Sequence, residues 1–142
     1  MATMHVRTGR VELTRAYHFS AGHCLGSPAL SADENVQLYG ACHRPHGHNY
    51  YVEVTVAGTP DPLTGMAVDL SEIDATVAHV VIDEVDHRTL EDTPLLSGVI
   101  TTGEGLARAF RNALVSALPN GALVGVVVQE TAKNRFEYRG TA

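Results

Sequence analysis

Two histidines, His46 and His48, open a stretch in which apolar and polar residues alternate over positions 50–56. Side chains two residues apart on a strand point to the same face, so both imidazoles are predicted to leave the strand end together. Two imidazoles placed this way can reach one small ion, at Zn–N distances of about 2.0–2.1 Å. Gly47 between them leaves room for a ligand. A polar strand end is the plainer explanation of such a pair, and a third histidine would favour the metal site.

The third histidine, His23, ends another strand-like segment. The odd positions from Val11 to Ala21 are largely apolar, and His23 continues their face. A lone histidine at a strand end is more often structural than metal-bound, but here His46 and His48 are available as partners. The sequence therefore predicts a metal site formed by His23 with the histidine pair. Cys24, which follows directly, is predicted to point away from the His23 face.

A thiol also lies near the histidine pair in the sequence. Cys42 precedes His46 by four residues, and it is open to three interpretations: a metal ligand, a buried apolar side chain or a nucleophile. It stands near the end of a connection over residues 25–45, which is rich in Ser, Pro and Gly and holds one short helical pattern at Ser31–Leu38. A connection of this length that ends at the histidines is predicted to be functional.

The elements that must position these residues are predicted from periodicity. After the first two strands, Asp69 can cap a helix over 71–85, and Thr101-Thr-Gly-Glu104 resembles a capping box that opens a second helix to about Leu118. Two more strands are predicted at 123–131 and 135–138, and residues 1–8 carry no pattern. The order ββααββ predicts an α+β fold, an antiparallel sheet of four strands with two helices on one face, as a single domain over 1–142.

The strand over 123–131 carries apolar residues on both faces. Val126, Val127 and Val128 are consecutive, so neighbouring valines point to opposite sides of the sheet. Two helices can cover only one side, which leaves the other side to a partner. We therefore predict a homo-oligomer in which subunits cover one another.

Composition narrows the functional classes. The chain has 142 residues, 44% of them hydrophobic and 18% charged, which is typical of one globular domain. A net charge of −6 without a basic cluster argues against nucleic acid and anionic membranes as partners. Two cysteines, no apolar run at the start and no long apolar stretch predict a cytoplasmic protein without a disulfide scaffold, signal peptide or membrane span.

Six short motifs occur in order along the chain. They are Phe19-Ser-Ala-Gly-His23, Cys42-x3-His46-Gly-His48-Asn-Tyr50, Gly65-Met-Ala-Val-Asp69, Asp86-His87, Thr102-Gly-Glu104 and Glu130-Thr131. Each is weak alone, but together they resemble the 6-pyruvoyl-/6-carboxy-tetrahydropterin synthase family over about residues 11–140. The resemblance implies a T-fold (tunnelling fold), whose subunit sheets join into a barrel, usually a hexamer of two stacked trimers with active sites between subunits. It also implies one Zn²⁺ per subunit and dihydroneopterin triphosphate as substrate, with Mg²⁺ as a companion of the triphosphate.

The resemblance further implies a role for each matching residue. His23, His46 and His48 match the zinc ligands. Cys42 matches the base that takes and returns a proton. Asp86 and His87 match a pair in which the carboxylate orients an imidazole that relays protons. The residues alone favour an ordinary loop pair after a helix.

Three more residues match the substrate side of the family's site. Glu130 matches the carboxylate that anchors the pterin, since a carboxylate can accept two parallel N–H bonds from a 2-amino-4-oxo pyrimidine edge. Glu104 and Thr102 match further substrate-binding residues. The plainer explanations are an ordinary polar strand residue for Glu130 and a helix cap for Glu104.

Two features of the sequence bear on the reaction product, and they conflict. The Cys42-x3-His46 spacing resembles the 6-carboxy branch of the queuosine pathway, whereas residues 31–42 and 119–123 resemble the 6-pyruvoyl branch of biopterin synthesis. The spacing bears directly on Cys42, the residue that matches the base, so we give it more weight. We therefore expect a lyase that converts 7,8-dihydroneopterin triphosphate to 6-carboxy-5,6,7,8-tetrahydropterin, with loss of triphosphate and acetaldehyde. The alternatives are a 6-pyruvoyl-tetrahydropterin synthase, a non-catalytic pterin- or purine-binding T-fold protein, and a zinc hydrolase, for which the sequence holds no His-Glu-x-x-His motif.

Overall fold

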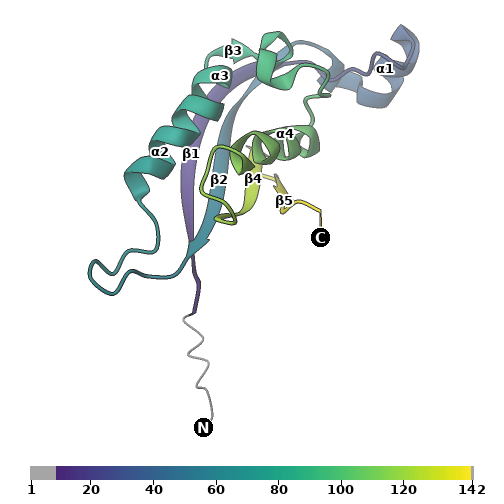
Figure 1. Ribbon diagram of the computed structural model, residues 1–142. Helices are drawn as coiled ribbons and strands as arrows, with labels where there is room; N and C mark the ends of the chain where they lie inside the picture. Colours follow the sequence, from purple (N-terminus) through teal and green to yellow (C-terminus); the bar gives the residue numbers. More distant parts are fainter. Residues whose placement is uncertain (1–8, 142) are drawn as a thin grey trace.

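Residues 9–141 of the chain are described by the structure, a computed structural model. Residues 1–8 and 142 lie outside this description, and with them the predicted patternless start and the outer ends of the predicted domain. The described residues form a long curved sheet with helices packed along one face (Figure 1). This arrangement confirms the predicted α+β class.

Two long strands form the middle of the sheet. β1 (Val11–His23) and β2 (His46–Gly58) pair antiparallel along their whole length. The register places His23 directly opposite His46, and Ala21 opposite His48. Because directly opposite residues point to the same side of an antiparallel sheet, the three histidines meet at one end of one face.

The sheet has five strands in the order β3-β1-β2-β4-β5. β4 (Leu123–Thr131) pairs antiparallel with β2, and β5 (Asn134–Tyr138) pairs antiparallel with β4. β3 (Arg88–Thr89) has only two residues and runs parallel to β1. The four predicted strands are present and pair antiparallel, but the prediction missed β3, because a two-residue strand leaves no alternation in the sequence that could reveal it.

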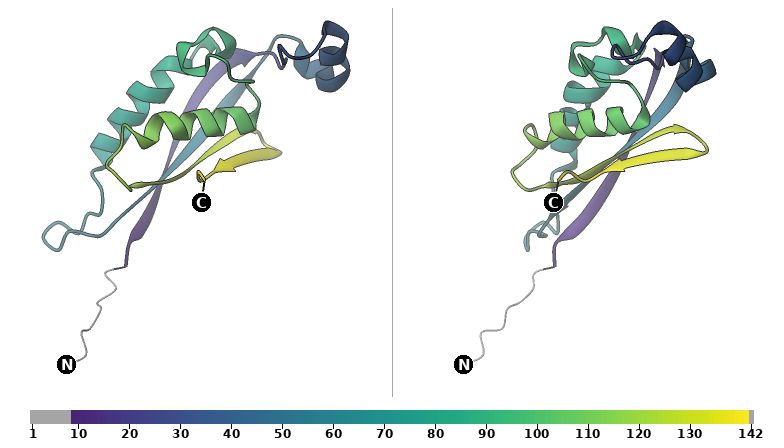
Figure 2. Two further views of the ribbon diagram at one scale, coloured as in Figure 1. Left: turned by 45° about the vertical axis from the view of Figure 1, so that its right-hand side comes forward. Right: turned by 90° about the vertical axis from the view of Figure 1, so that its right-hand side faces the viewer.

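Two helical segments cover one face of the sheet, as predicted (Figure 2). The first is continuous and consists of α2 (Leu70–Val77), a π-helical turn (Ala78–Ile82) and α3 (Asp83–Val85), with Asp69 as its N-cap. The second is α4 (Gly103–Val115), which ends before the predicted Leu118. No helix within residues 9–141 is long and apolar enough to cross a membrane.

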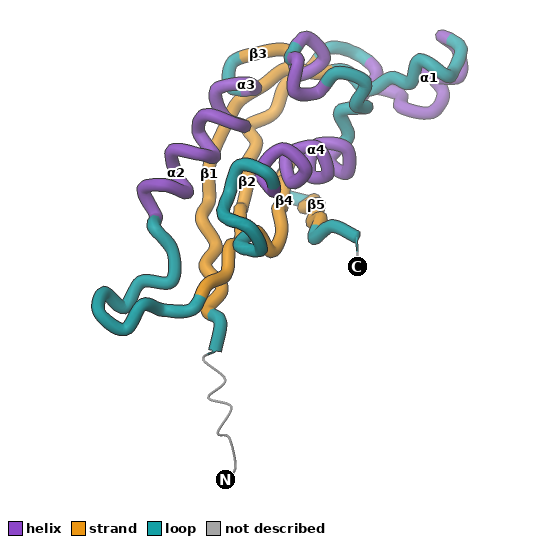
Figure 3. Tube along the Cα trace, in the orientation of Figure 1, coloured by secondary structure: helices purple, strands orange, loops and turns teal. Residues whose placement is uncertain are grey.

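A further helix, α1 (Ala32–Tyr39), lies beyond the end of the sheet at which β1 stops (Figure 2). Ser31 and Glu34 form a capping box at its start, with bonds of 3.0 and 3.1 Å between each side chain and the other residue's backbone N–H. A 3₁₀ turn (Gly40–His43) then leads to β2, and two more 3₁₀ turns (Leu90–Asp92 and Pro94–Leu96) lie between β3 and α4. Figure 3 shows these short turns gathered at the same end of the long strands as α1.

The hydrophobic core lies between the helices and the sheet. Phe19 stacks on Tyr50 with ring centroids 4.6 Å apart and meets Phe110 of α4 edge-on at 5.9 Å. All three rings are fully buried. Aromatic pairs of this kind add to the free energy gained from burial. The core thus reaches the histidine end of the sheet and gives it a rigid floor.

The opposite face of the sheet is more polar than the valine run predicted. Val126 and Val128 lie in the core, and only Val127 points the other way, where its strand neighbours are Glu53 and Glu137. That face also carries hydrogen-bonded polar pairs, such as Ser20–Asn49 and Thr14–Thr55. The predicted apolar second face is therefore wrong, because the alternation of polar residues in the other strands outweighs one valine.

Candidate metal centre and active site

Three imidazoles converge at the end of β1 and β2. One ring nitrogen from each of His23, His46 and His48 lies within 4.8 Å of the other two. The ring centroids are 4.5 Å apart for His23 and His46, 4.9 Å for His46 and His48, and 5.1 Å for His23 and His48. The predicted convergence is thus present, and it follows from the register of the two strands.

Backbone carbonyls orient two of these rings. His23 Nδ1 lies 3.0 Å from the Thr101 carbonyl oxygen, and His46 Nδ1 lies 2.7 Å from the Arg44 carbonyl oxygen. A carbonyl can only accept, so each Nδ1 must carry the proton and donate it. The lone pair is left on each Nε2, which is the arrangement that metal-binding histidines usually show.

His48 contributes a buried nitrogen that has no hydrogen-bond partner. A carboxylate oxygen of Glu130 lies 3.2 Å from His48 Nε2, but the alignment of the two groups is too poor for a hydrogen bond. Buried polar atoms are rarely left unpaired, and a cation is one way to satisfy this one. Three imidazoles with lone pairs directed to one point fit Zn²⁺ with an open fourth position, the arrangement of catalytic rather than structural zinc.

Burial favours the neutral form of two histidines of the cluster, His23 and His48. Burial, with a smaller contribution from His46 and His48, lowers the pKa of His23 to about 4. Burial also lowers the pKa of His48. Neutral imidazoles are the form that binds metals, so these two residues do not have to lose protons first.

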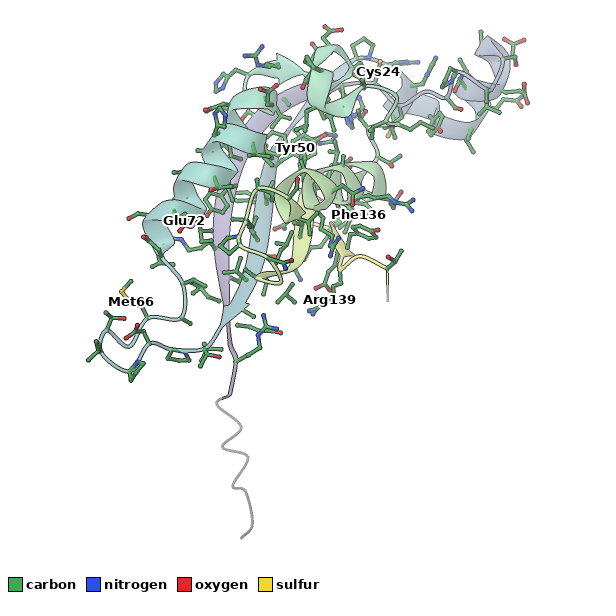
Figure 4. The ribbon with its side chains drawn as sticks, viewed as in Figure 1. Cys24, Tyr50, Met66, Glu72, Phe136 and Arg139 are labelled. Carbon is green, nitrogen blue, oxygen red and sulfur yellow. The ribbon has the colours of Figure 1, made fainter. Side chains whose placement is uncertain are left out.

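Tyr50 and Glu130 complete the inner wall of the site. The fully buried Tyr50 hydroxyl lies 3.3 Å from His23 Nε2, and Figure 4 shows its side chain between the helices and the sheet. Burial raises the pKa of Tyr50, so the phenol stays protonated. The Glu130 side chain is 14% exposed and lies beside His48, on the core face of β4. A carboxylate in such a position accepts hydrogen bonds and gains from meeting donors.

Cys42 lies outside the imidazole cluster. It is exposed on the 3₁₀ turn after α1, and within residues 9–141 it is not part of a group that could hold a metal. Two hydrogen bonds tie this turn to the chain just after His23: Leu25 N donates to the Cys42 carbonyl at 2.8 Å, and His43 Nδ1 donates to the Leu25 carbonyl at 2.6 Å. Cys24 is half-buried, and burial raises the pKa of its thiol.

Asp86 and His87 form a pair at the edge of β1. Asp86 Oδ1 accepts from Ser20 N at 2.9 Å and lies 2.9 Å from His87 Nδ1, and the Ser20 hydrogen bond holds the pKa of Asp86 below its usual value. His87 has a positive φ of 59°, and its side chain is 82% exposed. The pair is therefore ordered, but in the described part of the chain no hydrogen bond joins it to the three imidazoles. Its imidazole borders an open cavity of about 500 Å³ that Ser20 and Asn49 also line.

The two other predicted substrate residues lie at the start of α4. Thr102 is the N-cap, and its hydroxyl accepts from Gly105 N at 3.1 Å. Glu104 is exposed, makes no reciprocal cap bond and lines a cavity of about 550 Å³ between α4 and β5. The predicted capping box, with Thr101 as its first residue, is therefore wrong, because the helix begins one residue later and Thr101 turns inward instead.

Sequence reasoning missed three residues around His23, two of which contact its ring directly. Besides Tyr50, these are Thr101, whose hydroxyl and carbonyl both face His23 Nδ1, and Glu91, whose carboxylate bonds that hydroxyl. Tyr50 could have been found, because it continues the face of His46 and His48 on the strand. Thr101 and Glu91 could not, because the loop that brings them together has no periodic pattern.

The fold places the protein in the T-fold class, as predicted. The structure of 6-pyruvoyl tetrahydropterin synthase from Caenorhabditis elegans matches with a TM-score of 0.88 and 36% sequence identity, over 94% of this chain and 97% of that chain. A structure of 6-pyruvoyl tetrahydropterin synthase from Plasmodium vivax matches with a TM-score of 0.68, over 94% of this chain and 99% of that chain, and at 15% identity it supports the fold alone.

The family follows from the sequence. Residues 12–141 match the family described as 6-pyruvoyl tetrahydropterin synthase, and the chain belongs to that family. It is 41% identical to a 6-pyruvoyl tetrahydrobiopterin synthase of Poecilia reticulata over 90% of this chain and 89% of that protein. It is 39% identical to that of Homo sapiens over 94% of both chains.

These comparisons overturn the expected 6-carboxy product. A 6-carboxy-5,6,7,8-tetrahydropterin synthase of Aquifex aeolicus is only 27% identical, over 90% of this chain and 97% of that protein. The expectation rested on the short spacing between Cys42 and His46, which lies in an exposed turn and loop (Gly40–Pro45). Connections of this kind tolerate insertions and deletions, so their length is a weak guide to the reaction. Agreement along nearly the whole chain outweighs it.

Proposed function

We propose that the protein is a zinc-dependent 6-pyruvoyl-tetrahydropterin synthase, which eliminates triphosphate from 7,8-dihydroneopterin triphosphate. The observation that carries the proposal is the convergence of three imidazoles beside the Glu130 carboxylate, two of them oriented by backbone carbonyls. Identities of 41% and 39% to proteins named 6-pyruvoyl tetrahydrobiopterin synthase support this product. The cytoplasmic location stays a prediction from the sequence.

In this proposal His23, His46 and His48 hold one Zn²⁺ per subunit through their lone-pair nitrogens, and Mg²⁺ accompanies the triphosphate. A zinc ion held by these nitrogens would supply Lewis acidity to the substrate's side-chain hydroxyls, which would make the adjacent C–H more acidic. The core beneath the site excludes water from its floor, where Tyr50 is fully buried. A dry site strengthens every polar contact made with the substrate.

The substrate would be held and deprotonated by separate groups. Glu130 would accept parallel N–H bonds from the pterin edge, which sets the ring beside the metal. Thr102 and Glu104 would line the substrate side from the start of α4. The Cys42 thiolate would take a proton from the substrate side chain and return it, and the Asp86–His87 pair would relay protons.

We propose further that the active site is completed between subunits of a homohexamer. In the described residues, Cys42 and the Asp86–His87 pair make no hydrogen bond to the metal cluster, and His87 is exposed. Over residues 11–20, the outer edge of β1 has no strand neighbour in the described chain, and β5 is the other edge of the sheet. Such long open edges invite pairing with another copy, which would close the sheets into a barrel.

Product analysis tests the reaction. Zinc-loaded protein incubated with 7,8-dihydroneopterin triphosphate should release inorganic triphosphate and 6-pyruvoyl-tetrahydropterin, identified by mass under exclusion of oxygen. A 6-carboxy product with acetaldehyde, or no turnover by zinc-loaded protein, would contradict the proposal. Light scattering at micromolar concentration tests the assembly, and a stable monomer would rule out the hexamer.

A further inference from the structure

We propose that Glu91 and Thr101 are positioning residues for the metal, acting through His23. The inference rests on the proposed metal site and deepens it. It assigns to a carboxylate outside the imidazole cluster the task of fixing which nitrogen of His23 faces the metal and how firmly that ring is held.

The three residues form a chain of short polar contacts. Glu91 Oε1 lies 2.6 Å from Thr101 Oγ1, and Thr101 Oγ1 lies 3.2 Å from His23 Nδ1. The Thr101 carbonyl oxygen lies 3.0 Å from the same His23 nitrogen. Thr101 and His23 are 2% and 1% exposed, so water does not compete for the contact between them.

The chemistry of the groups fixes the direction of every hydrogen bond in this chain. An ionised carboxylate can only accept, so the Thr101 hydroxyl must donate its hydrogen to Glu91. Its oxygen then has only lone pairs to offer His23 Nδ1, and the Thr101 carbonyl likewise can only accept. His23 Nδ1 must therefore be the donor, which leaves the Nε2 lone pair for the metal. A carboxylate that backs a metal-binding histidine raises its basicity and fixes its orientation.

The backbone of the metal-binding strand holds Glu91 in place. Cys24 N donates to Glu91 Oε1 at 3.2 Å, and Cys24 follows His23 directly in the chain. The contacts therefore form a ring. Cys24, which follows the proposed metal ligand His23, donates to Glu91; Glu91 accepts from the Thr101 hydroxyl, and that hydroxyl faces the His23 imidazole. His46 has a simpler arrangement, because within residues 9–141 only the Arg44 carbonyl is hydrogen-bonded to its Nδ1. His23 is the ligand that this network controls.

The test is the zinc affinity of the full-length protein, measured by competition with a chromophoric chelator, together with the visible spectrum of the Co²⁺-loaded form. Thr101→Val keeps the shape and the carbonyl but removes the hydroxyl, and Thr101→Ser restores a hydroxyl. Glu91→Gln keeps the shape and removes the charge. Asp92→Asn is the matched control, because Asp92 is the next acidic residue along the chain and makes no side-chain hydrogen bond in the described structure.

We expect Thr101→Val and Glu91→Gln each to weaken zinc binding by about 10- to 100-fold and to change the Co²⁺ spectrum. Thr101→Ser and Asp92→Asn should stay near wild type. In the double variant the two losses should not add, because both act through one hydrogen bond. A purely structural role would instead give additive losses of stability with an unchanged Co²⁺ spectrum, and this result would overturn the inference.

The outcomes separate this inference from the proposed function. If wild-type protein binds zinc through His23 but Thr101→Val and Glu91→Gln bind it equally well, the positioning role is wrong and the metal site stands. If wild-type protein binds no zinc, or His23→Ala binds it as tightly, the metal site fails and the inference fails with it. If Thr101→Val does not fold, the Glu91→Gln measurement decides alone.

Discussion

The two ends of β1 carry polar clusters on the same face of the sheet, and the clusters differ in how completely their hydrogen bonds are made. In the first half of β1, two nitrogens of the Arg15 guanidinium donate to the carboxylate of Asp74 in α2 at 3.1 and 2.6 Å. The Tyr17 hydroxyl donates to the same carboxylate at 2.7 Å. The Arg15 guanidinium holds the pKa of Asp74 below its usual value. At the far end, His48 Nε2 is buried with no hydrogen-bond partner.

The difference separates a cluster that joins two elements of the fold from a cluster that could bind a ligand. The Arg15–Tyr17–Asp74 cluster joins a helix to the sheet, and its charges cancel within the chain. In the histidine cluster, the carbonyls of Thr101 and Arg44 orient two of the rings through Nδ1. The third ring has a buried Nε2 without a hydrogen-bond partner. Polar groups that are held in place but incompletely satisfied are typical of sites that wait for a ligand.

The strongest test of this comparison is to remove the unpaired nitrogen. We expect His48→Leu to lose zinc almost completely, because two imidazoles remain of three. The metal-free form of this variant should be at least as stable as metal-free wild type, since an unsatisfied buried polar group disappears. Metal analysis after desalting and urea denaturation measure the two effects. Asp74→Asn is the control from the other end of β1 and should lower stability while keeping zinc.

A large loss of turnover is expected when Cys42 is changed. Cys42→Ala removes the proposed base but no metal ligand, so turnover should fall by roughly 10²- to 10⁴-fold while zinc content and oligomeric state stay the same. Cys24→Ser is the matched control, because Cys24 is the other free cysteine and its thiol is not proposed to act on the substrate. Loss of zinc from Cys42→Ala would show that the thiol is a ligand.

Glu130 tests the substrate side of the same site. Glu130→Gln keeps the shape but replaces one acceptor with a donor and removes the charge, so it opposes one N–H of the pterin edge. Binding of a pterin such as sepiapterin or neopterin should weaken by about 30- to 1000-fold, or about 2–4 kcal/mol. Calorimetric titration gives the affinity, and zinc content should not change. Equal affinity in both proteins would mean that the pterin is anchored elsewhere.

The parts of the fold and of the candidate site that the sequence predicts are those that rest on a regular, local pattern of residues. The convergence of the three histidines follows from alternation, because His23, His46 and His48 each lie on the core face of a strand and the strand register is simple. The helices follow from caps and periodicity, as at Asp69. These features are local, and the sequence records them directly.

Features made by irregular segments could not be predicted. β3 has two residues, and the loop that brings Glu91 to Thr101 consists of short 3₁₀ turns. Neither has a period that a sequence can show. The second face of the sheet is a different case, because alternation in the sequence already places Glu53 and Glu137 on that face. These polar residues of the neighbouring strands outweigh Val127, the one residue of the valine run that points there.

The acid sensitivity of the metal-free protein should also come from the histidine end. Burial lowers the pKa of His23 to about 4, whereas an unfolded histidine titrates near about 6.5. The unfolded chain therefore takes up this proton first, so stability should fall as the pH drops from about 6.5 to 4. Urea denaturation of metal-free protein across this range measures the slope. His23→Gln should flatten it, and an unchanged slope would assign the titration to another group.

The smallest effect is expected at the structural end of β1. Tyr17→Phe removes one hydrogen bond to the Asp74 carboxylate but leaves the Arg15 pair in place, so it should lower the free energy of unfolding by about 1 kcal/mol. Tyr51→Phe is the matched control, because Tyr51 is half exposed and its hydroxyl makes no hydrogen bond within the described residues. Zinc affinity should be the same in both variants and in wild type. A tyrosine change at this end that weakened zinc binding would show that the two clusters are coupled along β1, and the division between a structural and a functional end would no longer hold.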